Sequence, residues 1–327
     1  MRSAKPIGSF GPIAADPSPI GATSVLIEPR VAPRPLMNRL TVNIHGWLLL
    51  LPAASLLALF THYPAIATLG HSLMSTPKAN RPSVFVGADN YLTLIEDPVF
   101  WRAVENNLWY CLGTIPVSIA LALLMAVWVN GKLAGRGWLR LAYFTPTVLP
   151  MVAVANIWLF FYTPQYGLLE QLTGLFGLPS HNWLGSPSTA LACVTIVAIW
   201  KESGFFMIFY LAALQQIPPV YAEAAAVEGA SRFTYFRRIV LPLLMPTTLF
   251  VLVNAVINAF RLVDHIVVMT RGGPDNATTL LLFHLYEVGF KFWDVGYASA
   301  ITAVLLGVLA LLALIQFGLL ERKIHYR

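Results

Sequence analysis

Apolar residues run in long stretches along most of the chain, and charged residues gather in the short connections between them. Six stretches are long enough to cross a bilayer as helices, which takes about 20 residues each. Apolar side chains surround each predicted helix, as helices in lipid or inside a bundle require. The pattern therefore predicts an all-α integral membrane protein with six transmembrane helices. The predicted spans are residues 46–74, 107–129, 141–161, 190–214, 243–269 and 295–320.

Composition supports this interpretation. Hydrophobic residues make up 57% of the 327 residues and charged residues only 11%, whereas a soluble domain is about one quarter charged. These values exclude a disordered chain, a nucleic-acid-binding module and an ordinary soluble enzyme. The two cysteines are too few for a disulfide scaffold or a multi-cysteine metal site. The seven histidines are scattered without metal-ligand spacing, so we expect no metal.

The basic residues predict the orientation. The two tails and the even-numbered connections together carry 14 of the 21 lysines and arginines, whereas the other connections carry 5. Basic residues favour the cytoplasmic side of a membrane. We therefore expect both termini in the cytoplasm of a bacterial cell, with the spans in its inner membrane.

The ends of the chain differ in character from its body. Residues 1–45 contain many prolines and no amphipathic period, which predicts a flexible cytoplasmic tail. They lack the short apolar core of a cleavable signal peptide, so we expect the first span to be retained. Residues 321–327 form a short basic cytoplasmic tail after the membrane domain at 46–320.

The connection at residues 217–242 carries its own helix signals. Pro218 and Pro219 favour a helix start, and the stretch that follows is rich in alanine and glutamate. Gly229 suits the left-handed end of that helix, and Ser231 suits the cap of a second one. A simple connector is the alternative, but connectors rarely devote about 25 residues to two ordered helices.

The same connection carries a spaced motif of seven residues: Glu223, Ala224, Ala225, Gly229, Ile239, Leu241 and Pro242. It resembles the signature loop of the membrane subunits of bacterial binding-protein-dependent ABC importers. The resemblance implies a coupling helix that docks in a cleft of an ATP-hydrolysing subunit, where Glu223 faces a basic group and Gly229 permits the turn. One departure is Glu228, where the family commonly has Asp, and the charge is kept.

The likeness extends from about Trp47 to Arg327 and points to the carbohydrate branch of these importers. It is carried by the segments at residues 85–91, 200–205, 211–218, 260–274 and 296–300. The segments at residues 277–283 and 316–327 resemble the glycerol-3-phosphate branch more narrowly. The resemblance implies glycerol-3-phosphate or a glycerophosphodiester as the solute, with an oligosaccharide such as maltose or trehalose as the alternative.

The resemblance also implies partners. These are a second homologous permease subunit, or a second copy of this chain, two ATP-binding subunits that hold ATP and Mg, and an external substrate-binding protein. The chain itself lacks a phosphate-binding loop, because its single Gly-Lys pair, Gly131-Lys132, is followed by Leu133. We therefore expect no enzymatic activity in this subunit and import by alternating access.

Polar residues inside the spans are candidates for the transport path, because they are unfavourable against lipid. Asn254, Asn258 and Arg261 lie on one helix face, and Arg261 is spaced to pair with Asp264. The alternative is that these groups join neighbouring helices or form an internal ion pair. Further candidates, each with packing as an equal alternative, are Trp200, Ser203 and Asn156. For Lys201 a structural role, such as a contact with another helix, is favoured.

Two other classes of protein remain as alternatives. A secondary transporter would need no ATP and would show internal repeats or broken helices. A membrane-embedded enzyme would need acid, base or metal groups clustered at one interface, and the scattered histidines do not provide them.

Overall fold

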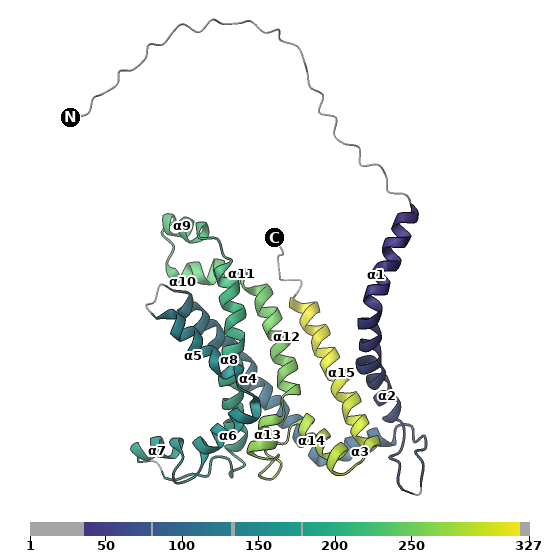
Figure 1. Cartoon of the computed structure of the whole chain (residues 1–327). Helices are drawn as coiled ribbons and strands as arrows, with labels where there is room; N and C mark the ends of the chain where they lie inside the picture. Colours follow the sequence, from purple (N-terminus) through teal and green to yellow (C-terminus); the bar gives the residue numbers. More distant parts are fainter. Residues whose placement is uncertain (1–35, 80, 132–134, 178, 321–327) are drawn as a thin grey trace, which may run out of the picture. The chain divides into compact units, whose positions relative to one another are not determined.

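The computed structural model describes residues 36–79, 81–131, 135–177 and 179–320. Their regular structure is helical, apart from two isolated bridges that join Met74 to Phe85 and Lys78 to Arg81 (Figure 1). The predicted tail up to residue 35 and the tail at 321–327 lie outside the described residues.

The chain divides into two units, 1–59 and 60–327, and each is described by itself. The first contains helix α1 (Leu36–Leu57), which has Pro52 in its interior and exposed side chains from Gly46 onward. This helix begins inside the segment that the sequence predicts as flexible. The reason is local, since Pro35 is the last proline of that segment and residues 36–45 contain neither proline nor glycine.

The second unit is a bundle of helices joined by short helical segments (Figure 1). A π-helical turn, η1 (Ala58–His62), crosses the boundary between the units. The elements after it are α2 (Tyr63–His71), α3 (Asp89–Glu96), α4 (Pro98–Asn130), α5 (Arg136–Val148), α6 (Met151–Tyr162), α7 (Leu168–Leu175), α8 (Ala190–Gln215), α9 (Val220–Val227), α10 (Arg232–Tyr235), η2 (Phe236–Val240), α11 (Leu241–Leu243), α12 (Met245–Arg261), α13 (Asp264–Met269), α14 (Leu281–Tyr286), η3 (Glu287–Lys291) and α15 (Val295–Leu320).

Among the described residues, five helical stretches are long and apolar enough to cross a membrane: Gly46–His71, Pro98–Asn130, Ala190–Gln215, Met245–Met269 and Val295–Gly318. The pair α5 and α6 makes a sixth if its two bent helices count as one span. The all-helical, multi-span architecture that the sequence predicts is therefore present, with five or six spans.

The stretch at 141–161 differs from a single continuous helix. Helices α5 and α6 meet at an angle of 103°. Pro150 explains the break, because a proline disfavours helical geometry in the residue before it. Leu149 is accordingly extended, with φ −73° and ψ 136°, and Pro150 caps the start of α6.

The stretch at 243–269 is also interrupted. Helix α12 ends at Arg261, Leu262 is extended with ψ 107°, and α13 begins at Asp264. The carboxyl half of the stretch is held from outside, since the Tyr110 hydroxyl lies 3.2 Å from Nε2 of the buried His265. Figure 1 shows α13 as a short helix below α12.

The core of the bundle lies along α4 and α8. Small residues of α4, Ala122 and Ala126, are fully buried, and large residues of α8, such as Phe206 and Tyr210, belong to the same cluster. Many large apolar side chains on the outside of the spans remain exposed, as helices that face lipid require. The pair α4 and α8 therefore forms the centre of this unit, and α5 and α12 pack against both helices.

The bundle has two ends that carry different elements. Figure 1 shows α9 and α10 at one end, called the α9 end below, and α3, α7 and α14 at the other, called the α7 end. Helix α7 has eight residues and is too short to span a membrane.

Candidate functional site

Helix α9 and the turn after it reproduce the structure that the sequence signals predict. Pro219 stands at the N-cap of α9, and Gly229 has φ +72°. The Gly229 amide donates to the Ala226 carbonyl at 3.1 Å, and the Ala230 amide donates to the Ala225 carbonyl at 2.9 Å. This pair of bonds is the Schellman arrangement that ends a helix.

The second helix of the connection begins at its expected cap. The Ser231 hydroxyl accepts a hydrogen bond from the Thr234 amide at 3.2 Å. From there the chain runs through α10, η2 and α11 into α12 without a loop. The connection is therefore an ordered helix, turn and helix.

The residues of the motif and their neighbours on α9 differ in exposure. Ala225 is buried, and a cavity of about 530 Å³ separates α9 and α10 from the ends of α4 and α8. Glu223, Ala224 and Glu228 are exposed, and Val227 is 90% exposed. Within the described parts of the chain, neither glutamate forms an ion pair. Helix α9 thus presents apolar and acidic side chains outward at the tip of the unit.

The polar residues of α12 have defined partners. The Asn258 amide donates to Oε2 of the buried Glu202 in α8 at 2.8 Å. The Asn254 amide donates to the Phe250 carbonyl of its own helix at 2.8 Å. Asn258 therefore joins α12 to α8, and Asn254 keeps its amide oxygen free of any hydrogen bond to a described residue.

Arg261 and Asp264 form no ion pair in the structure, although their spacing predicts one. The prediction assumes a continuous helix, but α12 ends at Arg261 and an extended Leu262 follows. The interruption moves the two side chains off a shared helix face. Both side chains are exposed.

The small cavity beside Glu202 has orphaned polar groups. It holds about 10 Å³ and is lined by Glu202, Asn258, Thr114 and Ser118. The hydroxyls of Thr114 and Ser118 are buried and have no hydrogen-bond partner among the described residues. The space is close to that of one water molecule.

Lys201 has the structural contact that the sequence favours for it. Its Nζ donates to the carbonyls of Pro146, Thr147 and Leu149 at 3.0, 3.4 and 2.6 Å. The last carbonyls of a helix lack partners within the helix, and Pro150 has no N–H to offer the Pro146 carbonyl. Lys201 of α8 thus caps the carboxyl end of α5 at the break.

The remaining candidates occupy three different surroundings. The Ser203 hydroxyl is buried and donates to the Ile199 carbonyl of its own helix at 2.5 Å. Trp200 is 41% exposed and meets Trp158 of α6 edge to face. Asn156 lines a cavity of about 570 Å³ near the α7 end. The structure thus brings together Asn258 and Glu202 and leaves the other candidates apart.

That larger cavity contains residues that sequence reasoning did not connect. Asn156 and Leu159 come from α6, Val267 and Val268 from α13, and Arg271, Phe283, Tyr286 and Lys291 from the segment that follows. The Gly-Gly-Pro run at 272–274 is typical of a turn, but the sequence gives no signal that this turn faces α6. Only the packing of α6 against α13 brings these side chains together.

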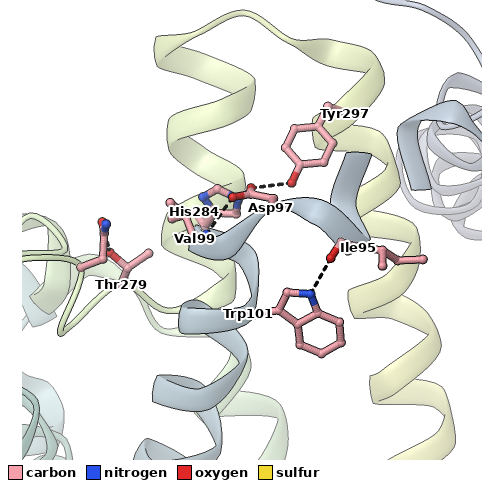
Figure 2. Close-up of polar contacts among 8 residues, drawn as sticks. Ile95, Asp97, Val99, Trp101, Thr279, His284 and Tyr297 are labelled. Carbon is pink, nitrogen blue, oxygen red and sulfur yellow. Dashed lines mark hydrogen bonds and ion pairs between the residues drawn. The ribbon is translucent and has the colours of Figure 1, made fainter. Parts of the chain in front are cut away.

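A second polar cluster at the α7 end joins three helices (Figure 2). Asp97 Oδ2 accepts from the Tyr297 hydroxyl at 2.6 Å and lies 3.1 Å from His284 Nε2, and its Oδ1 accepts from the Val99 amide at 2.8 Å. Burial would raise the pKa of Asp97, but these hydrogen bonds and the nearby His284 lower the pKa below its ordinary value. The cluster fastens the start of α4 to α14 and α15.

No group of three or more His, Cys, Asp or Glu side chains with metal-binding spacing occurs within the described ranges.

A family model described as "Binding-protein-dependent transport system inner membrane component" matches residues 118–326. The chain belongs to this family. The match contains α9, α12 and all residues of the larger cavity. The permease is thus a membrane-embedded transport subunit of the ABC type.

Curated relatives place the permease in the carbohydrate branch of the family. The trehalose/maltose transport system permease protein MalF of Thermococcus litoralis is 33% identical over 85% of this chain and 92% of its own. The sn-glycerol-3-phosphate transport system permease protein UgpA of Yersinia pestis is 31% identical over 86% of this chain and 95% of its own. The named solutes differ between these relatives.

A solved structure confirms the fold of the permease. A chain of the bacterial alginate ABC transporter, in complex with an alginate pentasaccharide-bound periplasmic protein, superposes with a TM-score of 0.77. It covers 88% of the permease and 97% of the alginate chain at 23% identity. At this identity the likeness shows the shared architecture.

Proposed function

We propose that this permease moves a sugar or polyol into the cytoplasm by alternating access, powered by ATP hydrolysis in partner subunits. In this proposal the α9 end and both termini lie in the cytoplasm, and the α7 end faces outward from the inner membrane. The assembly contains a second homologous permease, two ATP-binding subunits that hold ATP and Mg, and an external substrate-binding protein.

The observation that carries the proposal is the ordered α9 at the tip of the unit. Its exposed surface combines the acids Glu223 and Glu228 with the apolar side chains of Val220, Tyr221 and Val227. An exposed apolar patch next to unpaired charge is typical of a binding surface for another protein. A cleft with an apolar floor and a basic group would complement it.

The link from α9 to the spans supports force transmission. The turn at Gly229 is held by backbone hydrogen bonds, and α10, η2 and α11 continue directly into α12. A displacement of α9 therefore reaches α12, which carries Asn254 and Asn258, without passing through a loose loop. This continuity is the physical basis for coupling ATP binding to the solute path.

The solute path in this proposal follows α12 and the broken span beside it. Asn254 and Asn258 provide amide groups for solute hydroxyls, while Arg261 and Asp264 lie at the interruption nearer the α7 end. Trp200, Ser203 and Asn156 belong to the same path. The preferred solute is glycerol-3-phosphate or a glycerophosphodiester, and an oligosaccharide such as maltose or trehalose is the alternative.

The test uses the assembled transporter in lipid. We would measure ATP hydrolysis stimulated by the loaded binding protein for wild type, Glu223→Ala and Gly229→Pro. Loss of stimulation or of the ATP-binding subunits in both variants would support the coupling role. The matched control is Glu96→Ala, which removes an exposed acid at the α7 end.

The opposite outcome would favour a secondary transporter, which needs no ATP. A secondary transporter would have broken helices, and the described spans are interrupted at Leu149–Pro150 and at Leu262–Val263. If both α9 variants kept full stimulation and assembly, or if transport in vesicles persisted without ATP, the coupling role would be refuted.

A further inference from the structure

The cavity near the α7 end has the composition of a binding site for a small solute. Its volume of about 570 Å³ falls in the range of ligand pockets. Leu159, Val267 and Val268 make its apolar part, and Phe283 and Tyr286 add aromatic rings. Its charged lining residues, Arg271 and Lys291, are both cationic.

Arg271 is the free charge of this cavity. Its side chain is exposed, and among the described residues no acid lies within ion-pair distance of its guanidinium. Lys291 differs, because its Nζ lies 2.7 Å from Glu287 Oε1 and 5.6 Å from the centre of the Phe283 ring. The pair Lys291–Glu287 is close to neutral, so Arg271 gives the cavity its net positive charge.

The backbone around Arg271 is held in an unusual conformation. Arg271 itself has φ +52°, a region that non-glycine residues seldom adopt, and its amide donates to the Ile266 carbonyl at 2.7 Å. Gly272 follows at φ +82°, where a Cβ would lie 2.6 Å from both Phe283 and Thr279. Strained backbone of this kind persists only where the surroundings fix it.

Buried polar groups provide that fixation. Thr279 is fully buried, and its hydroxyl donates to the Gly272 carbonyl at 3.1 Å. The amide of Asn106, in α4, donates to the carbonyls of Asn276 and Thr279 at 2.7 and 3.0 Å. The turn is thereby tied to the central helix of the bundle. Arg271 is presented from a rigid support, which lowers the entropy lost when a ligand binds.

We propose that this cavity is an outer binding site for a sugar or polyol that carries a phosphate, sulfonate or carboxylate, and that Arg271 binds that anionic group. The planar guanidinium matches such oxyanions with two parallel hydrogen bonds. The Asn156 amide, whose nitrogen is already bonded to the Val152 carbonyl at 2.8 Å, offers its oxygen to a solute hydroxyl. The ring of Tyr286, which is 38% exposed, offers a face for the carbon skeleton.

The inference rests on the proposed import function, since it places the site on the outer side of the transport path. It deepens that function by separating the two solute classes left open above. A neutral disaccharide has no group for Arg271, whereas a phosphate ester does. The site assigns the anion to Arg271 on the turn, and not to Arg261 at the end of α12.

The experiment measures equilibrium binding of radiolabelled sn-glycerol 3-phosphate to the purified transporter in zwitterionic nanodiscs. Unlabelled sn-glycerol 3-phosphate, glucose 6-phosphate and glucuronate compete in one series, and glycerol and glucose compete in the other. We expect competition by the anionic series alone. Arg271→Gln should weaken binding roughly tenfold or more, and Arg271→Lys should weaken it less, because a charge-assisted hydrogen bond remains.

Two controls separate a site effect from a general charge effect. Arg102→Gln removes a cation that is paired with Glu105 and does not line the cavity, so binding should be unchanged. Lys291→Gln should have a smaller effect than Arg271→Gln, because Glu287 already offsets that charge. Equal binding of neutral and anionic solutes, no binding of any probe, or an unchanged Arg271→Gln variant would overturn the proposal.

Two further outcomes identify the source of failure. If anionic lipid in the nanodisc displaced the radiolabelled ligand and none of the soluble anions did, the ligand of the cavity would be a lipid headgroup. The solute proposal would then be wrong. Stimulated ATP hydrolysis that remained dependent on Glu223 would then leave the import function intact. Loss of that dependence would refute the import function separately.

Discussion

Gly204 shows how one residue sets the distance between two helices. A Cβ at this position would lie 2.1 Å from the Tyr143 carbonyl oxygen of α5 and 3.3 Å from the Thr147 hydroxyl. The obstacle is backbone, which cannot rotate away as a side chain can. Helices in membranes approach closely at such small residues. Gly204 therefore lets α5 lie directly on α8.

Replacing Gly204 with alanine should destabilise the bundle. We expect Gly204→Ala to lower the free energy of unfolding by about 1–3 kcal/mol, as overpacking does elsewhere. Thermal unfolding of the purified protein in detergent measures this. Gly307→Ala in α15 is the matched control, since a Cβ there meets nothing within 4 Å. Equal melting temperatures for the two variants would show that α5 can move away without loss.

The Asp97 cluster is held together by contacts of one carboxylate group. Its carboxylate accepts hydrogen bonds from Tyr297 and the Val99 amide and lies beside His284. Because the pKa of Asp97 is lowered in the folded protein, the cluster adds stability when the carboxylate is charged. That contribution is complete above the ordinary Asp value of 3.8 and is lost as the pH falls through the lower folded value.

A neutral substitute should remove this pH dependence. We expect Asp97→Asn to be less stable than wild type at pH 6, and the difference should shrink as the pH falls below about 4. Denaturation curves at a series of pH values test it. A constant difference at every pH would mean that packing, and not the carboxylate charge, stabilises the junction of α4, α14 and α15.

The elements differ in how far the sequence predicts them. The spans are predictable because apolar runs are local, and the α9 turn is predictable because Gly229 and Ser231 act on their own neighbours. The break between α5 and α6 lies at Pro150. The sequence pattern does not predict this break, because the apolar run continues on both sides of the proline. The break at Leu262 has no proline or glycine nearby. The spacing of Arg261 and Asp264 therefore suggests an ion pair on one continuous helix, which the structure does not have. There the outcome depends on distant contacts such as Tyr110 with His265.

The break between α5 and α6 should depend on Lys201. We expect Lys201→Met to lower the free energy of unfolding by about 1–3 kcal/mol, because it leaves the carbonyl groups of the buried Pro146 and the half-buried Leu149 without this donor. Lys201→Arg, which keeps donors at the same place, should lose less. Arg261→Met provides the control for removing an exposed cation. A more stable Lys201→Met protein would show that the burial of the charge outweighs the cap.

At the scale of the whole molecule, the sequence predicts the membrane class and the family but not the cavity near the α7 end. Family signals reside in contiguous motifs, which a single sequence displays. The cavity gathers residues of α6 with residues of α13 and α14, and more than 100 residues of chain separate α6 from α13. No local pattern encodes such a meeting, because it follows from the packing of α6 against α13.

The orientation of the bundle can be tested directly. Phe176 is 82% exposed beside α7, and Val227 is 90% exposed on α9. We expect a membrane-impermeant maleimide to label Phe176→Cys in intact cells with a permeable outer membrane, and Val227→Cys only after the inner membrane is broken. The native Cys111 and Cys193 are replaced beforehand to remove background. Labelling in the reverse order would invert the proposed topology.

The cap on α5 also bears on how the chain enters the membrane during synthesis. A lysine at the centre of a helix opposes insertion by about 2.5–3.5 kcal/mol, and Lys201 lies near the middle of α8. Its acceptors, at Pro146 to Leu149, are synthesised earlier. We therefore expect α8 to insert poorly alone and efficiently when α5 and α6 precede it, which an in vitro translation assay with microsomes or inverted vesicles would reveal. The order of the helices along the chain would thus serve biogenesis, with each early segment preparing the surroundings of a later one.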